Sequence, residues 1–110
     1  MATLHSIHPI EALVGARSST VRRGIKWYNE NDQNLELCYC HDGIHEIVGH
    51  GRSIIRALRT FNTLSDHELA NEHEASSRTV AGLLEAMRRA YGEDFKKTEL
   101  VTVLTYWRTD

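Results

Sequence analysis

The sequence predicts an α+β fold in which a small sheet of about five or six strands packs against a few helices. Residues 35–40 alternate between apolar and other side chains, as in a strand, and residues 99–107 are apolar on both faces, which is typical of a central strand. Between these strands, apolar side chains recur every three or four positions over residues 80–91 and predict a helix. Strand signals on both sides of this helix predict a single α+β domain over residues 1–110.

The first part of the chain contains a predicted short helix and a predicted strand. Pro9 suits the first turn of a helix, and apolar residues follow at helical spacing, so we expect a helix over residues 9–14 that Gly15 ends. Residues 18–23 favour an extended backbone through the β-branched Thr20 and Val21. Alternation along this strand places Ser18, Thr20 and Arg22 on one face, and Arg17, Ser19, Val21 and Arg23 on the other.

A hairpin is predicted in the middle of the chain. The dipeptide Asp42-Gly43 is a strong turn signal, so residues 44–48 should pair antiparallel with residues 35–40. Gly49 and Gly51 then indicate a bulge or a bend. Residues 52–61 fit two interpretations, because their apolar side chains have helical spacing while the hairpin needs a further partner strand. We expect a strand.

Two helices are predicted before the last strand. Ser65 and Glu68 form a capping box that should open a helix running to about His73. Ser76 or Ser77 should cap the second helix, at residues 80–91, whose apolar stripe we interpret as core and which should end at Gly92.

Composition limits the classes of function. The 110 residues are 41% hydrophobic and 25% charged, as in globular proteins, and the net charge of −2 argues against a uniformly basic nucleic-acid binder. Residues 17–26 nevertheless hold four cations and no acid, and a small basic patch of this kind suits phosphate contacts. No apolar run approaches the about 20 residues of a membrane span, and no secretory signal is visible, so we expect no membrane partner and a cytoplasmic location.

Three stretches resemble the ASCH domain: residues 15–22, residues 63–72 and the closing strand at residues 100–107. The closest-looking members of that family are the small bacterial N4-acetylcytidine amidohydrolases, and the resemblance spans nearly the whole chain. It implies a PUA-like small β-barrel with flanking helices, closed near the Gly49 and Gly51 bend. It also implies RNA or a pyrimidine nucleoside as the partner.

In these amidohydrolases the proposed catalytic residues are a lysine, a threonine three positions later and a glutamate on the helix after the barrel strands. The resemblance carries the threonine onto Thr20 and the glutamate onto Glu72, and it puts Arg17 where the lysine should be. It implies that Thr20 attacks an acyl carbonyl, that Glu72 relays the proton and that Arg17 stabilises negative charge. The arginine at the lysine position matters because a desolvated lysine can act as a base, whereas arginine, with a pKa above about 12, cannot.

Four further residues are candidates for binding RNA or a nucleoside. We expect Arg22, Arg23 and Lys26 to contact phosphate and Trp27 to stack on a base. Trp27 also fits a purely structural role as a plug at one end of the barrel, because tryptophan is highly buried on average.

Cysteine and histidine gather near the predicted hairpin, at Cys38, Cys40, His41, His45 and His50. Zinc prefers these residue types, but structural zinc sites favour cysteines separated by about two to four residues in a turn, and a Cys-x-Cys pair within one strand cannot surround an ion. We therefore interpret these residues as small buried thiols and surface histidines, and we expect no metal and no cofactor. Thiols so close in a strand cannot form an unstrained disulfide, which indicates a reducing compartment.

Three functions stay open at this point. The first is an enzyme that hydrolyses N4-acylated cytidine. A second is a ribonuclease that cuts single-stranded RNA, an activity that the ASCH family also includes. The third is a non-catalytic RNA-binding module, which the arginine at the lysine position favours. Whether the protein is an enzyme, and its oligomeric state, are not fixed by the sequence.

Overall fold

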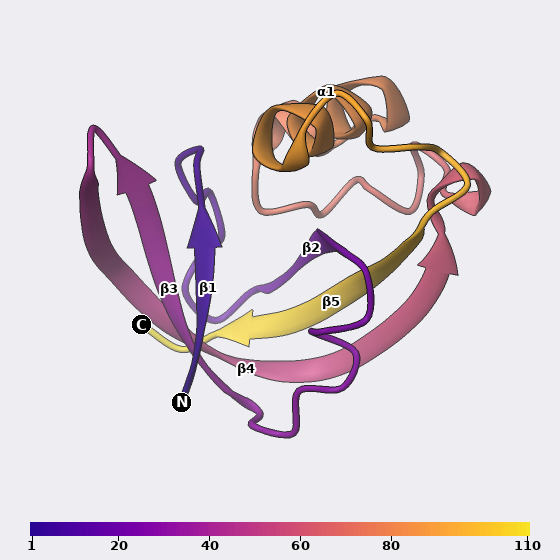
Figure 1. Ribbon diagram of the computed structural model, residues 1–110. Coiled ribbons are helices and arrows are strands. Elements are labelled where there is room, and N and C mark those ends of the chain that lie inside the picture. The colour runs from indigo at the N-terminus through magenta and orange to yellow at the C-terminus, as the bar shows by residue number, and fades with distance from the viewer.

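The computed structural model describes all 110 residues and shows a five-stranded mixed sheet with one α-helix (Figure 1). The strands are β1 (Ala2–Ser6), β2 (Arg17–Arg23), β3 (Asn34–His41), β4 (Ile44–Thr60) and β5 (Leu100–Arg108), and the helix is α1 (Val80–Tyr91). Their order in the sheet is β1-β3-β4-β5-β2. β1 runs parallel to β3, and the other neighbouring strands are antiparallel. No helix combines the length and apolar character that a membrane crossing needs.

β5 is covered on both faces, as its apolar sequence predicted. Side chains alternate between the faces of a strand, so Val101 lies on one face and Leu104 and Tyr106 lie on the other. Val101 belongs to a buried cluster that includes Leu83 and Met87 of α1. Leu104 and Tyr106 belong to a second cluster, together with Leu4 of β1 and Leu35 and Leu37 of β3. The curved sheet of Figure 1 therefore buries apolar side chains on both sides of β5.

The hairpin between β3 and β4 forms where it was predicted. Asp42 and Gly43 have φ values of 49° and 75°, the positive values that a tight two-residue hairpin turn requires. The expected bulge is present too, since the register shifts between Leu37 and Cys38. Gly49 lies beside it, and a Cβ there would approach the carbonyl oxygen of Asp110 to 2.6 Å. Glycine is needed at this position because the C-terminal residues pass so close to the strand.

The strand interpretation of residues 52–61 is confirmed, because β4 extends from Ile44 to Thr60. A register shift against β5 between Ser53 and Ile55 changes which side chains share a face. The helical spacing of apolar residues was misleading, since Ile54, Ile55 and Leu58 are all exposed.

The predicted closed barrel is not confirmed: β1 and β2 remain the two edges of the sheet, with no pairing between them. Residues 71–74 bridge the gap instead. Glu72 pairs with Ser19 in an isolated parallel bridge, and His73 N donates to Ser19 O at 2.7 Å. On the other side, the hydroxyl group of Ser6 in β1 donates to a carboxylate oxygen of Glu74.

The predicted helix over residues 65–73 is therefore wrong. The capping contact exists, since Glu68 N donates to Ser65 Oγ at 3.4 Å, but only turns follow it. The backbone of residues 71–73 bonds to Ser19 in place of a helical partner, a long-range pairing that local sequence does not encode.

The predicted helix over residues 9–14 is also wrong. Glu11 N donates to His73 O at 2.7 Å, and Leu13 and Val14 are exposed. α1, by contrast, follows its prediction and ends at Gly92, whose φ is 113°. Its N-cap is Thr79, whose Oγ1 accepts from Gly82 N at 3.0 Å, rather than Ser76 or Ser77.

Candidate ligand-binding pocket

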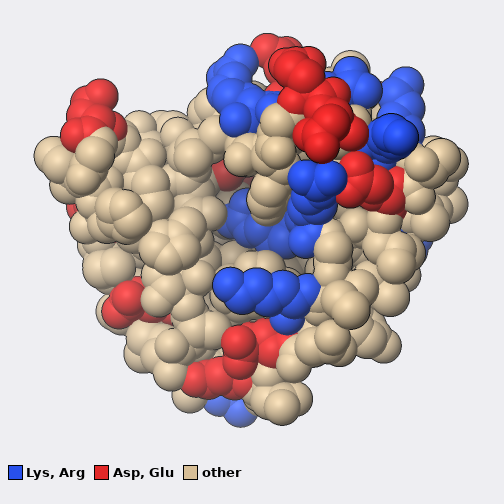
Figure 2. Space-filling view, in the orientation of Figure 1, with Lys and Arg blue, Asp and Glu red and all other residues tan.

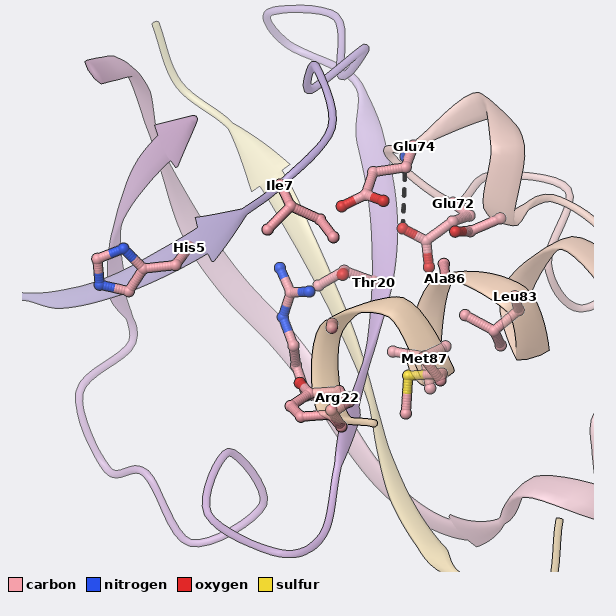
Figure 3. A pocket seen from close by; sticks show the side chains of 13 residues that line it. His5, Ile7, Thr20, Arg22, Glu72, Glu74, Leu83, Ala86 and Met87 are labelled. Carbon is pink, nitrogen blue, oxygen red and sulfur yellow. Dashed lines mark hydrogen bonds between the residues drawn. The ribbon is translucent and has the colours of Figure 1, made fainter. Parts of the chain in front are cut away.

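A pocket of about 210 Å³ opens beside the free edge of β2, between β1 and α1 (Figure 3). Its polar lining includes Thr20 and Arg22 of β2 together with Glu72 and Glu74 of the bridging segment. Apolar side chains of α1 form the opposite wall: Leu83, Ala86, Met87 and Ala90, with Tyr91 at the end of the helix.

Backbone pairing fixes the polar side of the pocket. Thr20 and Arg22 lie two positions apart on β2, so they share a face of the strand. The Ser19 bridge holds Glu72 against the outer edge of the same strand. Ser6 holds Glu74, and so ties this segment to β1 as well.

Glu72 is almost completely enclosed, with 2% of its surface exposed. Its Oε1 accepts a long hydrogen bond from Glu74 N at 3.4 Å, and the backbone N–H of Val21 also approaches the carboxyl group. Its Oε2 is buried and makes no hydrogen bond of normal geometry. Burial raises the pKa of Glu72 to about 8; the charge of Arg22 opposes this rise and that of Glu74 adds to it. Glu72 therefore carries its proton at neutral pH and can donate a hydrogen bond as well as accept one.

Arg22 brings a cation into the same pocket. One of its terminal nitrogens, Nη2, is buried and has no hydrogen-bond partner. No ion pair joins Arg22 to Glu72 or Glu74, although all three line the pocket. Buried polar atoms are nearly always hydrogen-bonded. The free Arg22 nitrogen and the free Glu72 oxygen therefore indicate where a ligand could supply the missing hydrogen-bond partners.

His73 lies behind the pocket and is fully buried. Its Nδ1 is 2.8 Å from the hydroxyl oxygen of Tyr106, and its Nε2 is 3.8 Å from carboxylate oxygens of both Glu72 and Glu74. Burial, with the nearby charge of Arg22, lowers the pKa of His73 well below its usual value. His73 is therefore neutral at pH 7, and its Nε2, like Oε2 of Glu72, is buried without a hydrogen-bond partner.

The structure brings three of the seven predicted site residues together in this pocket. Thr20, Arg22 and Glu72 line the pocket, whereas Arg17 does not. The Arg17 guanidinium lies over the ring of Trp107, 5.6 Å from its centre, and the residue lines a separate shallow hollow with Asn71. The separation follows the length of β2, because Thr20, Val21 and Arg22 line the pocket whereas Arg17 and Ser18, at the start of the strand, line the other hollow.

The remaining predicted binding residues lie around the pocket or away from it. Arg23 pairs with Glu99, Nε to Oε1 at 2.7 Å, and its guanidinium lies 6.0 Å from the ring centre of Tyr91, so Arg23 is at the rim of the pocket. Lys26 is exposed in the connection after β2. Trp27 is half-buried and packs against the cluster that contains Leu104.

Sequence reasoning missed Glu74, Ser77 and Tyr91, all of which line the pocket. Tyr91 was assigned to the apolar stripe of the helix, yet 39% of its surface is exposed. The run of acids over residues 66–74 gave a partial signal, but the burial of Glu72 and Glu74 depends on pairing with β2 and β1, which the sequence does not reveal.

Comparison with protein-family models and with curated proteins finds no match to this sequence. Solved structures do match. An ASCH domain from Lactobacillus crispatus JV V101 superposes with a TM-score of 0.62 at 12% identity, over 86% of this chain and 65% of that one. A protein from Enterococcus faecalis V583, assigned to the family model DUF984, superposes with a TM-score of 0.58 at 14% identity, over 87% of this chain and 65% of that one.

The present chain thus spans slightly less than two thirds of the length of each of these two proteins. At these identities the likeness concerns the fold, and it agrees with the three stretches of sequence that resemble the family. The chain has the fold of an ASCH domain.

Proposed function

We propose that this protein recognises RNA or a pyrimidine nucleoside by enclosing one base in the pocket between β2 and α1. The observation that carries the proposal is the pair of unsatisfied atoms there, Arg22 Nη2 and Glu72 Oε2. A ligand with a carbonyl oxygen for the guanidinium and a complementary N–H or N acceptor for the carboxyl group would satisfy both.

The size of the pocket supports a single ring. Its volume of about 210 Å³ is below the range of about 300–1,000 Å³ typical of sites for drug-sized ligands. A pyrimidine base carries ring carbonyl and amino groups along one edge, and proteins read such edges by hydrogen bonds while apolar or aromatic side chains cover the ring. Met87 and Tyr91 offer surfaces of this kind.

The charge around the pocket supports a phosphate-bearing ligand. Lys and Arg side chains gather in and around a hollow in the middle of the face drawn in Figure 2. Arg23 lies at the rim through its contact with Tyr91, and Lys26 is free to reach a backbone phosphate. A base in the pocket with phosphates across this rim is the arrangement we propose for RNA.

The pocket also supports a catalytic form of the proposal, hydrolysis of an N4-acylated cytidine. Thr20 Oγ1 would attack the acyl carbonyl while its proton passes to the carboxylate form of Glu72. The bond from the acyl carbon to the exocyclic nitrogen then breaks, the proton moves from Glu72 to the leaving amine, and water hydrolyses the acyl-threonine. Arg22, which lines the pocket while Arg17 does not, would stabilise the oxyanion.

The test is to incubate the protein with N4-acetylcytidine and, separately, with labelled single-stranded RNA, and to measure both binding and products. Wild type should bind, and Arg22→Ala should bind about 10- to 100-fold more weakly. Arg52→Ala removes an exposed arginine of β4 and serves as the matched control. Release of cytidine and acetate would establish an amidohydrolase, and RNA fragments would establish a ribonuclease. Binding without any product would establish a non-catalytic recognition module. No binding of either ligand would refute the proposal.

A further inference from the structure

Two cysteines and two histidines from three neighbouring strands meet in one cluster. His5 lies on β1, Cys38 and Cys40 on β3, and His45 on β4, and their ligand atoms all lie within 4.8 Å of one another. Cross-strand register explains the meeting, because His5 pairs with Cys38 and His45 pairs with Cys40. Paired residues point to the same face, as do residues two apart on one strand, so all four side chains share one face of the sheet.

Three distances within the cluster lie close to those of tetrahedral zinc. With Zn–S of about 2.3 Å and Zn–N of about 2.0 Å, a tetrahedral ion places its sulfur atoms about 3.8 Å apart and its sulfur and nitrogen atoms about 3.5 Å apart. Here Cys38 Sγ and Cys40 Sγ are 3.8 Å apart. Cys40 Sγ is 3.4 Å from His5 Nδ1 and 4.0 Å from His45 Nδ1.

The donor set indicates the metal and the type of site. Two thiolates and two imidazoles are the composition of one class of structural zinc site. A tetrahedral arrangement of two sulfur and two nitrogen donors indicates zinc or an iron–sulfur centre, and the single cluster of four ligand atoms favours one zinc ion. Four protein ligands leave no position for water or substrate. Both cysteines are free thiols, so neither sulfur is committed to a disulfide.

We propose that His5, Cys38, Cys40 and His45 bind one Zn²⁺ ion in a closed structural site that fastens β1 to the β3–β4 hairpin. The Cys-x-Cys spacing on one strand argued against a zinc site because one strand cannot surround an ion. The sheet removes that objection, since the strands on either side of β3 supply the two remaining ligands.

A bound ion would also stabilise β1, which forms one wall of the ligand pocket. β1 is an edge strand of five residues that pairs only with β3. Its Ser6 holds Glu74, and His5 and Ile7 line the pocket. Figure 3 shows His5 directed away from Glu72 and Glu74, so an ion bound there lies beside the pocket rather than in it. The inference does not depend on the function proposed for the pocket.

The test uses the full chain, reduced and freed of metal with a chelator. Zn²⁺ affinity and stoichiometry are measured by competition with a chromophoric chelator, and Co²⁺ serves as a spectroscopic probe of tetrahedral thiolate coordination. We expect one Zn²⁺ per chain, a tetrahedral Co²⁺ spectrum with thiolate charge-transfer bands, and a higher unfolding temperature with Zn²⁺ bound.

Variants assign the ligands. Cys40→Ser and His45→Ala alter side chains that are not fully buried, so both should fold, which circular dichroism checks. Removing a residue that only hydrogen-bonds to a metal ligand typically lowers metal affinity by about 10- to 100-fold. Each of these variants removes a ligand itself, so each should lose more Zn²⁺ affinity than that. His67→Ala, which removes an exposed histidine outside the cluster, should leave the affinity unchanged. Absence of 1:1 binding by the reduced, folded wild type, or full affinity in a folded Cys40→Ser/His45→Ala double variant, would overturn the proposal.

Discussion

Glu72 is held beside Ser19 in a parallel bridge along the free edge of β2, which puts a carboxyl group with 2% exposure next to the polar face of that strand. The backbone bonds of the bridge, Ser19 N to Asn71 O at 2.9 Å and His73 N to Ser19 O at 2.7 Å, fix the position of Glu72 independently of any charge partner. An acid placed in this way must affect how stability depends on pH.

We predict that the free energy of unfolding falls by about 1 kcal/mol between pH 6.5 and pH 8. Native Glu72 keeps its proton up to about pH 8, whereas an unfolded glutamate loses it near 4.5, so the native state binds more protons between these values and stability falls as pH rises through them. The lowered pKa of His73 acts in the opposite sense below 6.5, because unfolded histidine then binds a proton that the native state excludes. An unfolded histidine is still half protonated at pH 6.5, so its opposing effect is small from pH 6.5 upward and is gone by about pH 7.5.

Denaturant unfolding of wild type and Glu72→Gln at several pH values measures this effect. Glutamine keeps the shape and removes the titration, so the decline from pH 6.5 to 8 should disappear. Glu68→Gln is the contrast, because Arg59 holds the pKa of Glu68 below its usual value, and the stability from that pair is present above pH 4.5 and lost only in acid. An unchanged slope in Glu72→Gln would show that another group is responsible.

Local features of the sequence predicted the fold where short-range physics decides it. The stripe of α1, the Asp42-Gly43 turn and the apolar β5 all depend on neighbours in sequence, and all three form. Residues 65–73 carried an equally good local signal, the capping box, but the backbone from Asn71 to His73 pairs with Ser19 more than fifty positions away. No residue close to this segment in the sequence indicates that Ser19 is its partner.

The candidate site was predicted in part for the same reason. Strand alternation put Thr20 and Arg22 on one face and Arg17 on the other, and Arg17 does lie outside the pocket, although Val21, on the same face as Arg17, lines it. Alignment with the family motif led instead to Arg17. Similarly, Cys38 and Cys40 were considered without His5, because β1 lies 33 residues before β3 in the sequence and only the parallel pairing brings His5 to Cys38.

We predict that Thr20→Val abolishes release of acetate from N4-acetylcytidine and leaves binding of the nucleoside nearly unchanged. Valine keeps the β-branched shape that suits the strand and removes only the hydroxyl group. Thr20→Ser, which keeps a hydroxyl group, should retain measurable turnover. In wild type, kcat/KM should rise with pH towards about 8, since the carboxylate form of Glu72 is the base. Equal turnover in wild type and Thr20→Val would exclude Thr20 as the nucleophile.

A second set of measurements concerns phosphate contacts at the rim. If Lys26 contacts a phosphate of bound RNA, Lys26→Ala should reduce the slope of log K against log salt by about 0.7 for a single strand, and it should weaken binding of all sequences equally. Lys97→Ala removes an exposed lysine that does not line the pocket and is the matched control. Identical slopes for wild type and Lys26→Ala would place the RNA backbone elsewhere.

The last prediction separates Arg22 from Arg17. Arg22→Ala should weaken binding of N4-acetylcytidine or RNA by about 10- to 100-fold, because it removes the buried guanidinium and leaves the ligand carbonyl without its donor. Arg22→Lys should recover only part of this loss, since an ammonium group lacks the planar fork of arginine.

Arg17→Ala should change the same affinity by less than about twofold, because that side chain lies over Trp107 outside the pocket and shares no partner with Arg22. Arg17→Lys should likewise fail to raise turnover, since a lysine at this position has no access to the acyl group. Calorimetric or fluorescence titration of the three single variants, with melting curves to confirm that each is folded, gives the comparison. A large loss in Arg17→Ala with little change in Arg22→Ala would move the ligand to the other side of β2, into the hollow that Arg17 lines with Asn71.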